Sequence, residues 1–244
     1  MKAIIVAAGR SSRLYPQTLE TPKCLLPIGT TSIIERAIDL LNTVGVTQII
    51  VVAGFHHQKL RAALGGRARI VFNPFFAQTE NMVSLWLALL CVPGEAFLYA
   101  YSDVVFDQQL VDRLVAPPLE DGIRLLVDFE SVDAETTKVR IDGGRFAESS
   151  KDIPLAEAAG VWTGLAYVSA PAGEALRRCI EEFMEEQHFR NYDTAAFTRL
   201  AGYNMPFEMV ATDGLAWCEI DTLADLEQAR MVFGAPIEHA KPRY

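Results

Sequence analysis

The most chemically suggestive feature of the sequence is a basic, glycine-containing loop near the N-terminus. Arg10 and Arg13 lie in this loop, Lys23 follows it, and Gly9 permits a close backbone approach to a ligand. Small neighbours leave backbone N–H groups accessible, and Arg and Lys side chains can neutralise a polyphosphate. Because the whole chain carries a formal charge of −9, this local basic stretch is a candidate anion site. An ordinary strand-to-helix turn is the alternative, since neither GxxxxGK[ST] nor GxGxxG is present.

A second feature is a set of carboxylates that follow apolar, strand-like runs. Asp103 ends the run FLYAYSD, at the carboxyl end of a predicted strand, where open parallel sheets bind their ligands. Glu219 and Asp221 alternate along WCEIDT and would share one face of a strand. Carboxylates on one face repel each other unless solvent or a cation screens them, and Mg²⁺ prefers such oxygen ligands. Asp103 and Asp221 could instead cap a turn or a helix, as we expect for Asp107 and Thr222.

The apolar pattern that must position these residues alternates between strands and helices in the first half of the chain. Short, continuously apolar runs predict buried strands at 3–7, 48–54, 69–73 and 97–103. Helical spacing predicts helices at 31–43, 56–64, 82–90 and 106–115. This alternation indicates an α/β, Rossmann-like fold with a doubly wound, mostly parallel sheet and right-handed crossovers.

After residue 120 the predicted pattern becomes more mixed. We expect strands at 123–130, 137–142, 144–149 and 160–169, with a hairpin turn at Gly143-Gly144. Helices at 171–187, 193–201 and 222–233 follow, with two further strands before the last one. We interpret residues 1–244 as one domain, in which the mixed half (121–244) covers the open side of the parallel half (1–120).

Composition excludes several classes of protein. No apolar run approaches the roughly 20 residues that span a bilayer, and the N-terminus lacks the pattern of a signal peptide, so we expect a cytoplasmic location. The four cysteines form no CxxC pair, which argues against a disulfide framework or a zinc site. The negative charge argues against general nucleic-acid binding. A dinucleotide-dependent oxidoreductase would need GxGxxG and an acidic residue after the second strand, and the sequence has neither.

The opening segment resembles the signature of sugar-phosphate and phospho-alcohol nucleotidyltransferases, which have the MobA-like, nucleotide-diphospho-sugar transferase fold. The matching positions are Ala7, Ala8, Gly9, Arg13, Leu14, Pro16, Thr18, Pro22, Lys23, Leu25, Leu26 and Pro27. Ser11 departs from the pattern, because it replaces the usual second glycine. The resemblance implies that the loop, including Ala7, Ala8, Gly9, Arg10 and Ser11, wraps a nucleoside triphosphate. It also implies that Arg13 and Lys23 contact the phosphates.

The same resemblance assigns roles to the carboxylates and to one further lysine. It implies that Asp103 and Asp221 hold Mg²⁺, assisted by Glu219, and that Lys151 lies near the substrate phosphates. Lys151 could also be a solvated hairpin residue. The implied reaction is attack of an acceptor oxygen on the α-phosphorus with departure of pyrophosphate, stabilised by Mg²⁺ and basic side chains. The acceptor, a phosphate or phosphonate monoester, is already anionic and needs orientation more than a general base.

The segment from Asn73 to Ala88 indicates which nucleotide is bound. It resembles the corresponding segment of phosphocholine and 2-aminoethylphosphonate cytidylyltransferases, although Glu80 replaces the usual first Asn. The resemblance implies that Gln78, Asn81 and Ser84 lie near the base, and it favours CTP over UTP or dTTP. The parallel half is then the nucleotide-binding half and the mixed half the acceptor-binding half.

The acceptor is the least constrained part of the reaction. Trp162, Tyr192 and Asp193, with Phe189, could surround an ammonium or quaternary ammonium group, although aromatic residues are often part of a core. We therefore expect transfer of CMP to an acceptor of the phosphocholine or 2-aminoethylphosphonate type. A sugar- or polyol-phosphate acceptor, with CTP, UTP or dTTP as donor, is the alternative. A non-catalytic nucleotide-binding regulatory protein is an alternative of another class, and a homodimer is possible.

Overall fold

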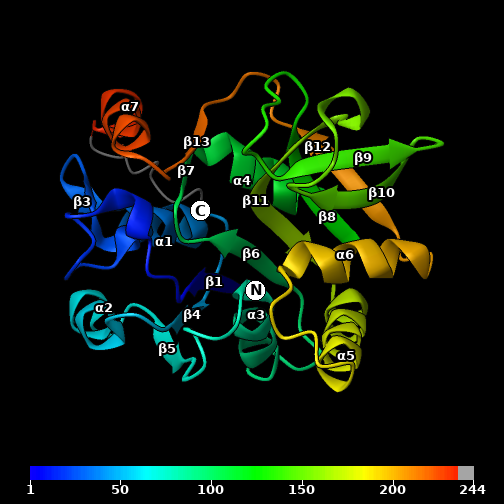
Figure 1. Cartoon of the computed structure of the whole chain (residues 1–244), viewed down its shortest axis with the longest axis horizontal. Helices are drawn as coiled ribbons and strands as arrows, with labels where there is room; N and C mark the ends of the chain where they lie inside the picture. The colour runs from blue at the N-terminus through cyan, green and yellow to red at the C-terminus, as the bar shows by residue number, and fades with distance from the viewer. Residues whose placement is uncertain (236–244) are drawn as a thin grey trace.

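A mixed sheet of nine strands runs through the computed structural model, which describes residues 1–235 (Figure 1). The sheet has the strand order β10-β9-β11-β6-β1-β4-β5, and β8 joins it by pairing with β11 and β12. This arrangement confirms the α/β fold class expected from the sequence. Residues 236–244, which the sequence predicts to belong to the same domain, lie outside the described residues.

The first half of the chain supplies the parallel part of the sheet. β1 (Lys2–Ala7) lies between β4 (Gln48–Ala53) and β6 (Phe97–Tyr101), and β5 (Arg69–Phe72) pairs with β4, all in parallel. β1, β4 and β6 are almost wholly buried, which explains their continuously apolar sequences. Parallel neighbours need crossover connections, and these are helical. The crossover helices are α1 (Ile33–Thr43), α2 (His57–Leu64) and α3 (Asn81–Leu89).

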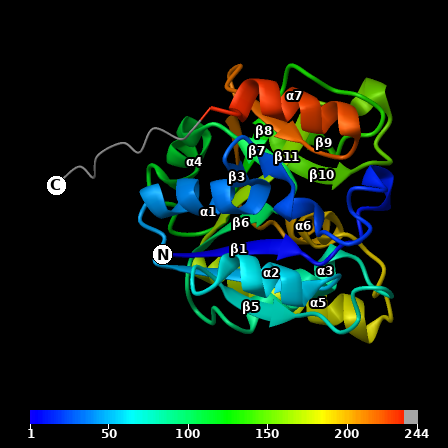
Figure 2. The same cartoon turned by 90° about the vertical axis from the view of Figure 1, so that its left-hand side faces the viewer.

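Helices cover both faces of this parallel part, because successive side chains of a strand point to opposite sides. On one face, Ile5 and Val51 pack with residues of α1, α2 and α4 (Gln108–Val115). On the other face, Ile4 and Ile50 pack with residues of α3 and α5 (Ala170–Glu185). Figure 2 shows α1 and α2 on the side of β1 that is turned towards the viewer.

The second half of the chain continues the same sheet in mixed orientation. β11 (Gly160–Val168) pairs antiparallel with β6, and β8 (Ile123–Asp128) pairs antiparallel with β11. The sequence predicted that the second half covers the open side of the parallel half. In the structure, the second half also adds strands to the same sheet. Hydrogen bonds from β11 satisfy the edge of β6, whose backbone groups would otherwise be unpaired.

The remaining elements of the second half agree with the predicted order. The hairpin at Gly143-Gly144 is confirmed, and it joins β9 to β10. β12 pairs in parallel with β8, on the side away from β11. The bounds are β9 (Lys138–Asp142), β10 (Arg145–Ser150), α6 (Asp193–Gly202), β12 (Phe207–Ala211) and α7 (Leu223–Phe233). Short elements complete the chain: η1 (Ser12–Leu14), η2 (Lys23–Leu25), β2 (Pro27–Ile28), β3 (Thr31–Ser32) and η3 (Leu155–Glu157).

Two short strands form a separate sheet that differs from the sequence-based expectation. The sequence predicts one strand over 97–103 and a helix from 106. Instead, β6 ends at Tyr101, the chain turns through Ser102 and Asp103, and β7 (Val104–Phe106) begins. β7 pairs antiparallel with β13 (Trp217–Glu219), a strand from the far end of the chain. A three-residue strand is too short to leave an alternating signal in the sequence.

The two predicted helix caps are confirmed. The Asp107 carboxylate accepts a hydrogen bond from the N–H of Gln109 at 2.8 Å, at the start of α4. Thr222 and Asp225 form a reciprocal capping box at the start of α7. Asp107 and Thr222 therefore cap the N-termini of α4 and α7, respectively.

Two further expectations bear on the class of protein. None of the helices within residues 1–235 is both long and apolar enough to cross a membrane. The four cysteines are free thiols, with Cys24 and Cys179 buried. Burial raises the pKa of the Cys24 thiol to about 12 and that of Cys179 to about 11, so both are protonated at neutral pH.

Gly164 allows β11 to approach the ring of Tyr101, and it provides a test of this fold. Its φ is +81°, and a Cβ there would lie 2.7 Å from the Tyr101 ring. We expect Gly164→Ala to lower the free energy of unfolding by about 1–3 kcal/mol. Gly202→Ala in α6 is the matched control, because its Cβ would meet no atom within 4 Å. Chemical denaturation should show no loss of stability for the control, and equal losses for both variants would contradict this interpretation.

Candidate functional site

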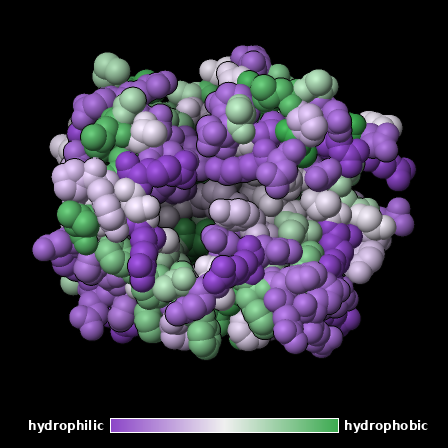
Figure 3. Space-filling model, viewed as in Figure 1, coloured by the Kyte–Doolittle hydropathy of each residue, from purple (hydrophilic) through white to green (hydrophobic). Residues whose placement is uncertain are grey.

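A cleft of about 840 Å³ opens at the carboxyl ends of β1 and β6, between the two halves of the chain. Open α/β sheets bind their ligands at this edge. Figure 3 shows a hollow in the middle of one face, with hydrophilic side chains around its rim.

The cleft brings together most of the residues that the sequence singled out. They come from the end of β1 and the loop after it, from η2, from α3 and the segment before it, from the turn between β6 and β7, and from the second half. Those that line it are Ala7, Ala8, Gly9, Arg10, Ser11, Arg13, Lys23, Gln78, Asn81, Ser84, Asp103, Lys151, Tyr192, Glu219 and Asp221. Trp162 and Asp193 are not part of the lining.

The conformation of the loop after β1 is held by a hydrogen bond from within the same segment. Ser11, at the position of the usual second glycine, has φ 52° in the left-handed region, which explains why glycine is common there. The buried Thr18 hydroxyl donates to the Ser11 carbonyl at 2.7 Å and holds this conformation. Arg10 lies over the ring of Phe76, at 5.7 Å from its centroid, so this cation is held at the mouth of the loop.

Three carboxylates meet at the floor of the cleft. Asp103 follows β6, Glu219 ends β13, and Asp221 follows two residues later; one oxygen of each lies within 4.8 Å of the others. The pairing of β7 with β13 creates this cluster, and the N–H of Ile220 donates to the Asp103 carbonyl at 2.9 Å. Glu219 and Asp221 therefore reach one site even though Asp221 lies beyond the end of the strand.

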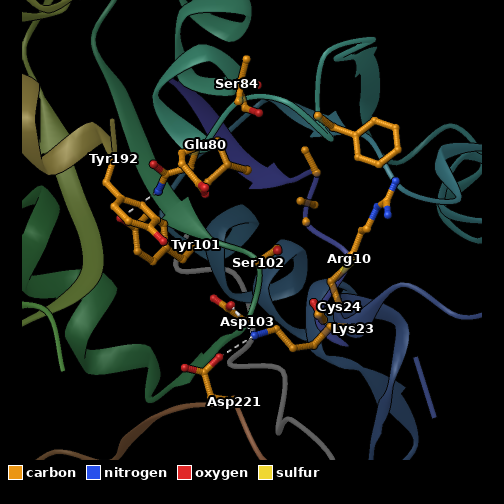
Figure 4. A pocket seen from close by; sticks show the side chains of 18 of the residues that line it. Arg10, Lys23, Cys24, Glu80, Ser84, Tyr101, Ser102, Asp103, Tyr192 and Asp221 are labelled. Carbon is orange, nitrogen blue, oxygen red and sulfur yellow. Dashed lines mark hydrogen bonds and ion pairs between the residues drawn. The ribbon is translucent and has the colours of Figure 1, made fainter. Parts of the chain in front are cut away.

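Lys23 lies between two of these carboxylates (Figure 4). Its Nζ is 2.6 Å from Asp103 Oδ2 and 3.0 Å from Asp221 Oδ1, and Arg13 is 2.9 Å from Asp221 Oδ2. Burial alone would lower the pKa of Lys23, but the two aspartates outweigh it and raise that pKa. For Asp221, Lys23 and Arg13 outweigh burial and lower the pKa. Lys23 and Asp221 are therefore both charged at neutral pH.

The surroundings of Glu219 disfavour its ionised form. Burial, followed by the charges of Asp103 and Asp221, raises the pKa of Glu219 to about 7. Three clustered carboxylates with hard oxygen donors match what Mg²⁺ binds. A divalent cation would also relieve this repulsion. The donor set therefore fits a magnesium-type ion.

Trp162 is a core residue, and the expectation that it contacts an acceptor is corrected. Only 2% of it is exposed, its ring packs against Tyr99, Tyr101 and Phe197, and its Nε1 donates to the Leu165 carbonyl. The side chain lies on the inner face of β11, and its bulk fills the core.

Asp193 is also removed from the cleft, so its predicted contact with an acceptor is corrected too. It is fully buried and accepts hydrogen bonds from the hydroxyls of Tyr99 at 2.6 Å and Tyr101 at 2.7 Å. Burial raises its pKa, whereas bonds from Tyr99, Tyr101 and Asn81 oppose that rise. All side-chain partners of this carboxylate donate hydrogen bonds to it, so the arrangement favours the ionised form. Tyr192, its neighbour, is 53% exposed and does line the cleft.

Several residues that line the cleft were not predicted from the sequence. Tyr101 lies two positions before Asp103, so the period-two alternation of β6 could have indicated it. Arg190 and Asp152 lie in loops without a motif, and among residues 1–235 neither has an ion-pair partner within 4.0 Å. A second cavity of about 550 Å³ adjoins the cleft, and both are lined by Arg190, Asp152 and Tyr192.

Comparison with known proteins gives this geometry a family context. The family model of the MobA-like NTP transferase domain matches residues 3–133. The chain is 29% identical to a CTP:phosphoglutamine cytidylyltransferase of Campylobacter jejuni, over 93% of this chain and 98% of that protein. It is 27% identical to the CMP-5'-(3-aminopropyl)phosphonate synthase of Streptomyces rubellomurinus, over 99% of this chain, but it spans only 40% of that longer relative.

A solved structure has the same fold. The CTP:phosphocholine cytidylyltransferase of Streptococcus pneumoniae superposes with a TM-score of 0.76, over 95% of this chain and 98% of that chain, at 20% identity. At this identity the likeness concerns the fold alone.

The Lys23 contacts predict a metal-dependent stability. Lys23→Met removes a side chain that is 10% exposed and leaves Asp103 and Asp221 without their shared counter-charge. We expect the free energy of unfolding in metal-free buffer to fall by about 3 kcal/mol. Added Mg²⁺ should raise the melting temperature of the variant more than that of the wild type, because it replaces the missing cation.

The matched control for this experiment is Lys59→Met. Lys59 forms an exposed ion pair with Glu20 at 3.6 Å, so its loss should cost less than about 1 kcal/mol. Equal destabilisation of the two variants, or the same Mg²⁺ response in Lys23→Met as in the wild type, would contradict the balance of charges described above.

Proposed function

Because the chain belongs to the MobA-like NTP transferase family, we propose that it transfers CMP from CTP to a small phosphate or phosphonate monoester and releases pyrophosphate. The observation that carries this proposal is the cluster of Asp103, Glu219 and Asp221 beside Lys23 and the loop after β1. A cation site next to a basic loop at the carboxyl edge of a sheet is the arrangement that a metal-bound triphosphate needs.

The chain's own residues would hold the donor. The residues from Ala8 to Ser11 line the cleft, and a Cβ at Gly9 would meet no atom within 4 Å. This open space would let phosphate oxygens approach the backbone N–H groups of the loop. Arg13 and Lys23 would neutralise the phosphate charge, as a planar fork and as a point charge respectively. A divalent cation held by Asp103 and Asp221, with Glu219 beside them, would supply Lewis-acid stabilisation at the α-phosphate.

Lys151 would orient the acceptor. It lines the cleft after β10, and its charge acts on Glu219 and Asp221, where it opposes the rise in the pKa of Glu219. The acceptor phosphate is already anionic near neutral pH, so positioning and charge screening contribute more than proton removal. Lys151 and Arg190 are the cations of the second half that line the cleft.

The choice of CTP rests on the relatives and on the segment before α3. The names of the relatives given above refer to CTP as a substrate or to a CMP-phosphonate as the product. Gln78 and Ser84 line the cleft on the side of α3, where a base would lie beyond the loop that holds the phosphates. We therefore propose that this side selects cytosine over uracil or thymine.

For the acceptor we propose an amine- or quaternary-ammonium-bearing monoester, of the 2-aminoethylphosphonate or phosphocholine type. The exposed ring of Tyr192 is available to a cation at the acceptor end of the cleft. The second candidate is a sugar- or polyol-phosphate. The adjoining cavity of about 550 Å³ favours it, because Ser150, Asn191 and Thr198 offer hydrogen bonds there.

Removal of either metal-binding carboxylate should abolish turnover. We expect Asp103→Ala and Asp221→Ala each to lower kcat/KM for pyrophosphate release by at least about a hundredfold, because the cation loses a ligand. The matched control is Asp107→Ala, which removes only the cap of α4 and should cost about 1 kcal/mol of stability without loss of activity. Retained activity in both site variants would exclude this assignment.

The nucleotide and acceptor can be tested in one panel. With Mg²⁺ and either phosphocholine or 2-aminoethylphosphonate, kcat/KM should be at least about tenfold higher with CTP than with UTP or dTTP, the effect of one well-placed hydrogen bond to the base. A sugar phosphate as the best acceptor would favour the second candidate. Binding of CTP without pyrophosphate release for any acceptor would indicate a non-catalytic nucleotide-binding protein.

A further inference from the structure

Two helices on different sides of the cleft begin at residues that are bonded to each other. α3 begins at Asn81 and α6 begins at Asp193. Asn81 Nδ2 donates to Asp193 Oδ1 at 3.0 Å, and the Asp193 N–H donates to Asn81 Oδ1 at 2.9 Å. This reciprocal pair therefore joins the first turn of a helix in the nucleotide-binding half to the first turn of a helix in the other half.

Burial and charge make this pair costly to break. The carboxylate of Asp193 is fully buried and, besides Asn81, accepts from Tyr99, from Tyr101 and from the N–H of Thr194. Hydrogen bonds to a charged acceptor are stronger than bonds between neutral groups. A buried carboxylate that loses them destabilises the fold, because its desolvation is no longer compensated. The two helix starts are therefore held together by more than packing.

The hydrogen bonds of Asn81 show that it acts as a link and does not read the base with its amide N–H groups. One of its two amide hydrogens goes to Asp193 and the other to the Tyr101 hydroxyl, also at 3.0 Å. Nδ2 has no further hydrogen to offer a nucleotide base. Asn81 lines the cleft, but its amide hydrogens are already used within the protein.

The neighbours of the linked residues face the two ligands of the proposed reaction. Glu80 and Ser84 lie beside Asn81 at the start of α3, and Tyr192 and Thr194 flank Asp193 at the start of α6; all four line the cleft. Figure 4 shows Glu80, Tyr101 and Tyr192 in the same wall. A ligand that fixes the first turn of α3 therefore also fixes the first turn of α6, because the buried bonds leave little freedom between them.

We propose that Asn81 and Asp193 form a latch that couples the two binding sides: nucleotide bound against the start of α3 orders the start of α6 and so prepares the acceptor side. This inference rests on the proposed function, because it takes the nucleotide to bind on the side of α3. Asp193 is then a positioning residue that acts through Asn81 and Tyr101. Coupling of this kind is reciprocal, so an acceptor should equally favour nucleotide binding.

Hydrogen exchange with CTP alone tests the latch without knowledge of the acceptor. We expect CTP with Mg²⁺ to slow amide exchange in α6, from Ala196 to Leu200, by about fivefold or more in the wild-type protein. In Asp193→Asn the slowing should disappear, since an amide at this position cannot accept from all four donors. Direct contact of CTP with α6 would leave the slowing intact in this variant, so the two explanations separate.

Two further variants complete the experiment. Tyr99→Phe is the matched control, because Tyr99 donates to the same carboxylate but does not line the cleft; it should lower stability and keep the CTP-induced slowing. Asn81→Ala breaks the pair from the other side and leaves Asp193 bonded to both tyrosines. It replaces Asp193→Asn if that variant does not fold, and it should lose the slowing as well.

Calorimetry shows whether CTP binds, and so distinguishes a failure of the latch from a failure of the proposed function. CTP binding with no slowing in the wild type, or with the same slowing in Asp193→Asn and Asn81→Ala, would overturn the latch and leave the proposed function standing. Loss of the slowing in Tyr99→Phe would also overturn it, because the effect would then follow stability alone. Failure of CTP to bind the wild type at all would contradict the proposed function itself.

Discussion

The candidate site depends on the antiparallel contact between β7 and β13. This contact brings Asp103, which follows the central strand β6, beside Glu219 and Asp221 from the far end of the chain. Three carboxylates at such short range repel one another, and the fold balances them with Lys23 and Arg13. The cost of assembling this charge is the reason why we propose the cluster as a site for a divalent cation.

β6 connects this cluster to the rest of the molecule. It is parallel to β1 on one side and antiparallel to β11 on the other, so both halves of the chain share it. Its carboxyl end carries Tyr101 and leads into Asp103, and these two residues serve the two proposed tasks of the cleft. Asp103 would bind the cation, and Tyr101 takes part in the bonds between α3 and α6. A change in the register of β6 would therefore disturb both.

The sequence predicted the parallel half of the sheet and most of the cleft lining, because continuous apolar strands and a glycine loop leave strong local signals. It also indicated the caps at Asp107 and Thr222, whose residue types suit those positions. It did not reveal the β7–β13 pairing, since three-residue strands carry no periodic pattern and the two strands lie far apart in the sequence. Trp162 and Asp193 were misassigned because aromatic and acidic residue types suit a binding site and a satisfied core equally well. Only the burial and the hydrogen bonds of these two side chains distinguish the alternatives.

The proposed cation site is tested most directly by a crystal structure of the protein with Mn²⁺ and a CTP analogue that carries an α,β-methylene bridge, using the anomalous signal of manganese. We predict a manganese peak coordinated by Asp103 and Asp221, with Lys23 moved from the carboxylates to the phosphates of the analogue. A manganese peak away from these carboxylates, or a bound analogue with Lys23 still bridging Asp103 and Asp221, would contradict it.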